Sequence, residues 1–214
     1  MASPERFRFE MGGEWDIDDL ESLSAALRLS YAYFYWITVD PEVMEPRVRS
    51  MFSRYFWSGE YIGDRFAQDL YYHIPAEYRL RIASIHYSSP GWLEVIGAIG
   101  VIHALALCVR AWIHNGEKVF DLFTKINRYF EDRKLQRIKK LVSLDDIGPE
   151  VIDEARGLCF EFGKVLGLDE QQALQMIDLT GNPISTLRLM VALSNESKRL
   201  IELQNAGKLK LPNQ

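Results

Sequence analysis

The chain has 214 residues, of which 48% are hydrophobic and 26% are charged, and its formal net charge at pH 7 is −5. This composition is typical of a globular protein with a sizeable core, and the negative charge argues against general nucleic-acid binding. The two cysteines, Cys108 and Cys159, lie in apolar stretches, which favours a reducing compartment over a disulfide-stabilised secreted protein.

The N-terminal residues predict a strand. Phe7, Phe9 and Met11 alternate with charged side chains over residues 6–11, and a period of two is typical of a half-buried strand. These residues contain no apolar run of the kind found in secretory signals, so we expect the protein to be cytoplasmic.

A helix is predicted next, from Ile17 to about Ile37. Asp16 is a good N-cap, and Asp18 and Asp19 place negative charge where the helix dipole favours it.

The end of this helix, residues 31–36, is denser in aromatic side chains than one helical face can bury. We expect these side chains to contact a covering insertion, a partner or a ligand, and core packing under a covering segment is the favoured interpretation. The aromatic segment consists of Tyr31, Tyr33, Phe34, Tyr35 and Trp36.

Residues 41–75 form an insertion that prolines and glycines interrupt, and we expect one or two short helices there. Residues 79–97 then predict a β-hairpin. Its turn is expected over residues 89–92, where Pro90 presets φ and Gly91 would supply the positive φ of a type II turn. Strict alternation in the first strand would place one set of side chains on one face, namely Leu80, Ile82, Ser84 and His86, and the neighbouring set, which includes Ile85, on the other.

Residues 98–112 predict a helix that is apolar on every side, interrupted by Gly100, His103 and Arg110. A core helix that covers the sheet is favoured. A membrane span over residues 93–112 is the alternative, although a span needs about twenty consecutive apolar residues and this stretch contains charges. The predicted organisation is helix-rich α+β: a small antiparallel sheet covered by helices in residues 1–116, with the insertion at 41–75, followed by a charged helical extension in residues 117–214.

The extension begins with an amphipathic helix over residues 117–141. Its polar face is basic, and the next segment, residues 144–180, is acidic, so the two could pair within one molecule or between molecules. The cations of this basic arm are Lys125, Arg128, Arg133, Lys134, Arg137, Lys139 and Lys140.

Local signals divide the rest of the extension into three helices. A helix opens at Gly148-Pro149 and ends before Gly167, a second follows Asp169, and a third begins after Gly181-Asn182-Pro183 and ends before Gly207. Residues 208–212 predict a short extended tail.

Reactive chemistry is sparse in the sequence. None of the four histidines has a metal-ligand or base partner at a recognised spacing, and there is no phosphate-binding, nucleophile-elbow or zinc-binding motif. Glu94 directly follows the turn, where pairing with Arg79 or Arg81 is favoured over a catalytic role. The sequence therefore identifies no catalytic residue, metal, cofactor or small-molecule ligand.

The hairpin motif I-x-x-x-S-P-G-x-x-E-x-x-G resembles one found in a group of uncharacterised bacterial proteins, with a β-α-β start, an apolar helix and a charged helical arm. The resemblance spans most of the chain and associates it with bacterial signalling or defence loci, including antiviral defence, while it implies no biochemical activity and no active-site residue. The residues that carry it are Ile85, Ser89, Pro90, Gly91, Glu94 and Gly97.

The leading functional hypothesis is a non-enzymatic module for protein–protein interaction or oligomerisation. Its partner would be a second copy of the chain or another protein. One alternative is a membrane-active effector that uses the 93–112 segment at a membrane surface. The other is an unrecognised enzyme that uses Glu94 with His86 or His103. The predicted interaction residues are Tyr31, Tyr33, Tyr35, Trp36, Arg128, Arg133, Lys134, Arg137 and Lys140.

Overall fold

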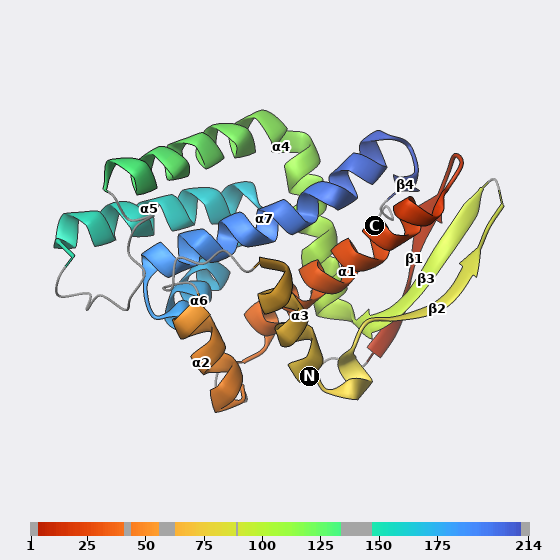
Figure 1. The fold of residues 1–214 in the computed structure, drawn as a ribbon, viewed down its shortest axis with the longest axis horizontal. Helices are drawn as coiled ribbons and strands as arrows, with labels where there is room; N and C mark the ends of the chain where they lie inside the picture. The colour runs from red at the N-terminus through yellow and green to blue at the C-terminus, as the bar shows by residue number, and fades with distance from the viewer. Residues whose placement is uncertain (1–3, 41–43, 56–62, 89, 134–146, 211–214) are drawn as a thin grey trace.

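The computed structural model describes residues 4–40, 44–55, 63–88, 90–133 and 147–210. In this part of the chain a small antiparallel sheet lies at one end of a helix-rich molecule, with the helices on one side of the sheet (Figure 1). The fold is helix-rich α+β, as predicted from the sequence.

The sheet has the strand order β2-β3-β1-β4, and each neighbouring pair is antiparallel. Its inner face carries Phe9, Leu93 and Val95, each at most 2% exposed, and packs against the helices. The predicted first strand and hairpin are confirmed, and the C-terminal tail contributes a short fourth strand. The strands are β1 (Pro4–Met11), β2 (Arg81–His86), β3 (Gly91–Ala98) and β4 (Leu209–Lys210).

Helix α1 (Ile17–Thr38) begins at the predicted N-cap. The Asp16 side chain accepts a hydrogen bond from the Asp19 backbone at 2.8 Å, and the Asp16 backbone donates to the Asp19 carboxylate at 3.0 Å. This reciprocal capping box satisfies two amide groups at the start of the helix. α1 then packs against α3, α4, α6 and α7, so it lies at the centre of the fold.

The insertion supplies two helices, α2 (Pro46–Tyr55) and α3 (Gly63–His73), and a short 3-10 turn, η2 (Ala76–Tyr78), directly follows it. Phe66 of α3 contacts the ring of Phe52 at a centroid distance of 5.3 Å and that of Tyr33 at 6.0 Å. The insertion is therefore a packed lid over α1.

Helix α4 (Ile99–Asp132) changes direction at Asn115, where the backbone leaves helical geometry (φ −120°, ψ 22°). Its first part lies against the sheet and its second part runs along α5 (Figure 1). The boundary expected between residues 116 and 117 therefore falls beside a kink within one helix. Although the first part of this helix is apolar on every side, it is not buried on every side, because Leu107 is 48% exposed.

Helices α5 (Pro149–Val165), α6 (Glu170–Thr180) and α7 (Pro183–Asn205) follow the predicted punctuation. Asp169 forms a capping box with Gln172, and Gly181 ends α6 in the left-handed conformation at φ +80°. Residues from both sides of position 116 share one hydrophobic core, and the division into two units stays a prediction.

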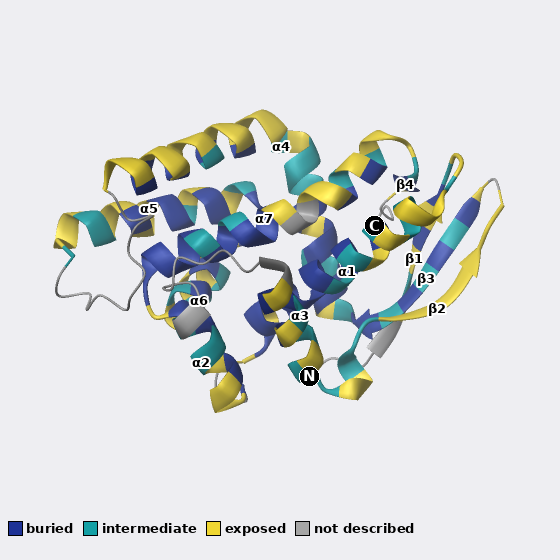
Figure 2. Ribbon diagram, in the orientation of Figure 1, coloured by how far each residue is buried: buried dark blue, intermediate teal, exposed yellow. Residues whose placement is uncertain are grey.

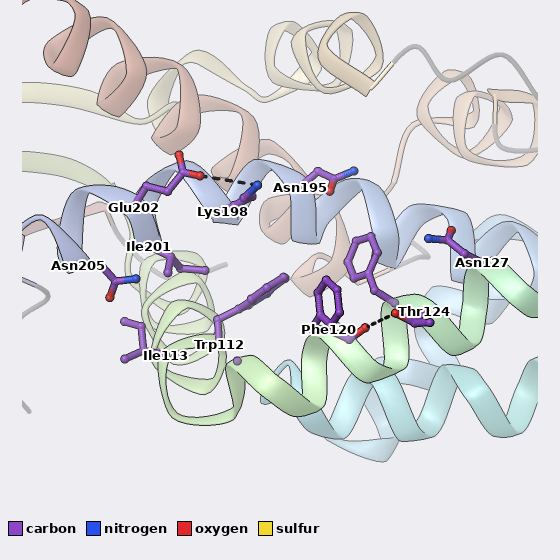
Figure 3. A pocket seen from close by; sticks show the side chains of 12 residues that line it. Trp112, Ile113, Phe120, Thr124, Asn127, Asn195, Lys198, Ile201, Glu202 and Asn205 are labelled. Carbon is purple, nitrogen blue, oxygen red and sulfur yellow. Dashed lines mark hydrogen bonds and ion pairs between the residues drawn. The ribbon is translucent and has the colours of Figure 1, made fainter.

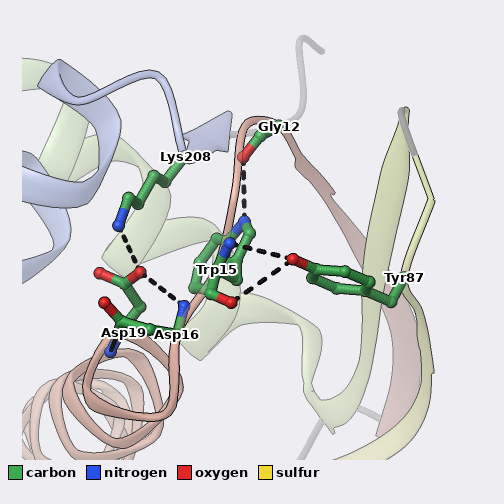
Figure 4. A network of polar contacts seen from close by, with 6 residues as sticks. All are labelled: Gly12, Trp15, Asp16, Asp19, Tyr87 and Lys208. Atoms are coloured by element: carbon green, nitrogen blue, oxygen red, sulfur yellow. Dashed lines mark hydrogen bonds and ion pairs between the residues drawn. The ribbon is translucent and has the colours of Figure 1, made fainter.

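A polar network fastens the C-terminal strand to the start of α1 (Figure 4). The Lys208 ammonium contacts the Asp19 carboxylate, and the Gly12 amide donates to the Lys208 carbonyl at 2.9 Å. The Lys208 hydrogen bond lowers the pKa of Asp19, and the same bond raises the pKa of Lys208. Tyr87 joins this network through the backbone amide of Trp15, which donates to its hydroxyl at 3.1 Å.

Candidate interaction surface

The aromatic segment proposed for docking lies in the core. Tyr31 and Tyr33 are 0% exposed, Tyr35 is 2% and Trp36 is 4% exposed. These four side chains therefore form no accessible surface, which corrects their assignment as interaction residues.

Helix α3 of the insertion and the following η2 turn cover them. The Trp36 indole donates to the Leu70 carbonyl of α3 at 2.9 Å, and the Tyr31 hydroxyl donates to the Tyr78 carbonyl at 2.6 Å and accepts from the Ala98 amide at 2.8 Å. Because burial removes water from the phenol, the pKa of Tyr31 rises to about 12. The core interpretation with a covering segment is the one that these contacts support.

Two of the three described cations of the basic arm form ion pairs within the molecule. Lys125 contacts Glu161 at 2.6 Å, and Arg133 contacts Glu154 at 3.1 Å, so α4 and α5 are joined by two ion pairs. Arg128 is exposed. The other predicted cations lie outside the described residues, namely Lys134, Arg137, Lys139 and Lys140.

The hairpin motif has structural roles. Glu94 is held by Arg6 at 3.2 Å and by the Ser84 hydroxyl at 3.4 Å, and Arg8 lies 4.0 Å away. These arginines belong to β1, so the expected pairing with Arg79 or Arg81 is wrong. The reason is register, because β1 places Arg8 directly opposite Glu94.

Gly91 does not supply a positive φ, since it lies in β3 in extended geometry. It is a glycine because a Cβ there would lie 2.6 Å from the His86 carbonyl oxygen. The type II turn is therefore wrong in this respect, and Ser89 of that turn lies outside the described residues.

Of the two proposed acid–base pairs, Glu94 with His103 is separated by the sheet, whereas His86 shares the outer face with Glu94. His103 contacts Phe7 on the inner face of the sheet, at a ring distance of 6.1 Å, whereas Glu94 lies on the outer face. His86 lies on the outer face, where its ring stacks on Trp92 at 3.9 Å and the Arg8 guanidinium lies 4.8 Å from the Trp92 ring. In the described residues no group of three or more His, Cys, Asp or Glu side chains could hold a metal ion.

The 93–112 segment is not one helix, because it begins in β3 and continues as α4. Among the described residues, no helix combines the length and the apolar character that crossing a membrane requires.

A groove of about 610 Å³ lies between α4 and α7 on either side of the kink (Figure 3). Trp112, Phe120 and Phe123 supply an apolar wall, and Lys198 and Glu202 on the opposite side pair with each other at 3.7 Å. The volume is in the range of small-molecule sites. The lining carries no net charge and no reactive group, so it selects no class of ligand.

Strand β2 is the most exposed element of the sheet. All six of its residues are exposed, while β3 alternates between buried and half-buried positions (Figure 2). Within the described residues β2 pairs only with β3, which leaves its other edge open. Its large side chains Ile82 and Ile85 are 51% and 48% exposed, and Tyr87, just beyond the strand, is 64% exposed.

An irregularity in β2 places both isoleucines on the same face. Ile82 lies opposite Val95, and Ile85 lies opposite Leu93, so both follow the inner face of β3. The register shifts between Ile82 and Ser84, where the strand contains one extra residue. Sequence alternation assigned the two isoleucines to opposite faces and missed this surface. The sequence does contain a signal for this surface, because Ile82 and Ile85 are separated by two small residues, Ala83 and Ser84.

A search of protein-family models, of curated proteins and of solved structures finds no match to this chain.

Proposed function

We propose that this chain is a non-enzymatic protein–protein interaction module and that β2 is the strand through which it docks. The observation that carries the proposal is the exposure of Ile82, Ile85 and Tyr87 along a sheet edge to which no other described strand is paired. Burial of apolar surface drives most protein association, and an open edge adds backbone hydrogen bonds to an incoming strand. β2 offers both to a protein partner.

The neighbouring polar groups support docking over catalysis. The Glu94 carboxylate is engaged by Arg6 and Ser84, and the His86 ring is engaged by Trp92. A catalytic base needs access to a substrate proton, and the contacts with Arg6 and Ser84 occupy the Glu94 carboxylate, which is the acidic group that would serve. The exposed isoleucines are then the chief feature of this surface.

A photo-crosslinking side chain at position 85 tests the proposal, with one at position 174 as a matched control. Leu174 of α6 is 49% exposed against 48% for Ile85, so both probes are equally accessible. In cells of the source organism we expect discrete protein adducts from position 85 and none from position 174. Equal labelling at both positions, or no adduct from position 85, would overturn the proposal.

A further inference from the structure

We infer that the partner of β2 is β2 of a second copy, in an antiparallel two-fold pairing that places Ile82 of each copy opposite Ile85 of the other. This inference rests on the proposed function and adds to it the partner and the register. The pairing joins two sheets into one continuous sheet, because a two-fold axis perpendicular to the sheet keeps both inner faces on the same side.

The sequence of inner-face and outer-face side chains along β2 is symmetric about the centre of the strand. Arg81 and His86 lie opposite outer-face residues of β3 at the two ends, Ile82 and Ile85 follow the inner face, and Ala83 and Ser84 occupy the centre. Residues directly opposed in an antiparallel pair point to the same face.

Only one register between the two copies of β2 pairs each residue with the residue at its symmetric position. With Ala83 opposite Ser84 of the second copy, every isoleucine meets an isoleucine. A shift by one residue places Ile82 opposite His86 or Ser84 instead. The self-complementary register therefore gathers four apolar side chains that are about half exposed in the single chain.

The bulge in β2 is the reason that Ile82 and Ile85 lie on the same face and can pair with each other across the two copies. In an unbroken strand, residues three apart point to opposite faces, so Ile82 and Ile85 could not share one side. Edge strands are commonly protected by a charged side chain that points inward. β2 has isoleucines at its inward positions and its charged residue, Arg81, at one end.

Charge favours the antiparallel arrangement over a parallel one. Two antiparallel copies hold their Arg81 side chains at opposite ends of the strand pair, whereas parallel copies would bring them together. β2 contains no acidic residue, so no ion pair across the two strands contributes. We therefore expect an association that changes little with salt.

The strand is short, so the dimer should be reversible. Stable interfaces bury on the order of 1,200–2,000 Å² in total, and pairing of two six-residue strands supplies a small contact by that measure. The mean molar mass should rise with concentration from 24.8 kDa toward about 50 kDa, twice the chain mass.

Light scattering over a concentration series measures this rise. Ile85→Lys should hold the protein at 24.8 kDa, because it places a charge between the isoleucines. Leu174→Lys is the matched control and should dimerise as the wild type does. Near-ultraviolet circular dichroism, unchanged in both variants, would show that neither substitution disturbs the core.

Disulfide trapping tests the register. Ala83→Cys protein mixed with Ser84→Cys protein should give the mixed dimer in several-fold excess over either homodimer, since only these two positions are opposed. The native thiols will not compete, because Cys108 and Cys159 are buried. A predominant Ser84→Cys or Ala83→Cys homodimer would place the strands one residue out of the inferred register and overturn it.

The outcomes separate this inference from the proposed function. If the purified chain stays at 24.8 kDa while position 85 still crosslinks to a different protein, self-pairing is wrong and docking through β2 stands. If the chain dimerises and Ile85→Lys has no effect, the dimer uses another surface and self-pairing through β2 is wrong. Absence of any adduct from position 85 in cells would then remove the docking role as well.

Discussion

At the level of single residues, the hairpin motif is explained by packing. Gly97 lies beneath the Tyr31 ring, and a Cβ at this position would be 3.0 Å from the ring carbon Cε2. Tyr31 in turn connects η2 to the junction of β3 and α4 through its hydroxyl. The last glycine of the motif is thus required by one buried tyrosine.

Gly97→Ala is expected to lower the free energy of unfolding by roughly 1–3 kcal/mol, as overpacking of a core typically does. Gly157→Ala is the control, because Gly157 lies in α5 and a Cβ added there would meet no atom of another element within 4 Å. That change should raise stability by about 0.5–1 kcal/mol through helix propensity. Urea denaturation measures both, and an unaffected Gly97→Ala protein would contradict the close approach of Tyr31.

Tyr31→Phe is expected to cost about 1–3 kcal/mol of stability, because it leaves the buried Ala98 amide and the Tyr78 carbonyl without their partner. Tyr72→Phe serves as the control. Tyr72 is 57% exposed, so its loss should change stability by less than about 0.5 kcal/mol. Equal effects from the two variants, measured by the same urea titration, would argue against a structural role for the Tyr31 hydroxyl.

At the level of elements, local signals predict helix boundaries well. Asp16, Asp169 and the Gly181-Asn182-Pro183 break act within one turn of their own position, so the sequence contains the whole cause. The β2 bulge has a different origin. Its extra residue is defined by register against β3, and a period-two pattern cannot encode that, so the surface formed by Ile82 and Ile85 was not predictable from alternation.

The contact between α4 and α5 gives a prediction at the same scale. In a double-mutant cycle of Lys125→Ala and Glu161→Ala, the coupling energy should be about 0.2–1 kcal/mol, since both side chains are half exposed. It should shrink at high salt as the charges are screened. A coupling energy near zero at low salt would show that the pair does not form in solution.

At the level of the whole molecule, long-range packing decided what the aromatic segment does. Its density was visible in the sequence, but the identity of its cover was not, because Phe66 and Leu70 reach it from an insertion more than thirty positions away. Because of this packing, the aromatic side chains that the sequence suggested for docking are part of the hydrophobic core. The opposite charges of the basic arm and the following acidic segment were also visible in the sequence. In the described residues, two ion pairs join these segments between α4 and α5.

This buried aromatic core should make stability fall in alkaline solution. Burial raises the pKa of Tyr31, Tyr35 and Tyr129 to about 12, from the ordinary value of about 10. Below pH 10 these phenols are protonated in both states, and their effect on stability is constant. As pH rises from 10 to 12, the unfolded chain loses these protons first, so the free energy of unfolding decreases.

Urea titrations at pH 9 and pH 11, together with tyrosinate absorbance, measure this effect. We expect lower stability at pH 11, with several tyrosines that ionise only on unfolding or near pH 12. Tyr31→Phe should show a smaller loss between the two pH values than the wild type, because one of the three phenols with a raised pKa is gone. If all tyrosines of the folded protein titrated near pH 10, the hydroxyls of Tyr31, Tyr35 and Tyr129 would be open to water, and the packing around α1 and between α4 and α5 would be wrong.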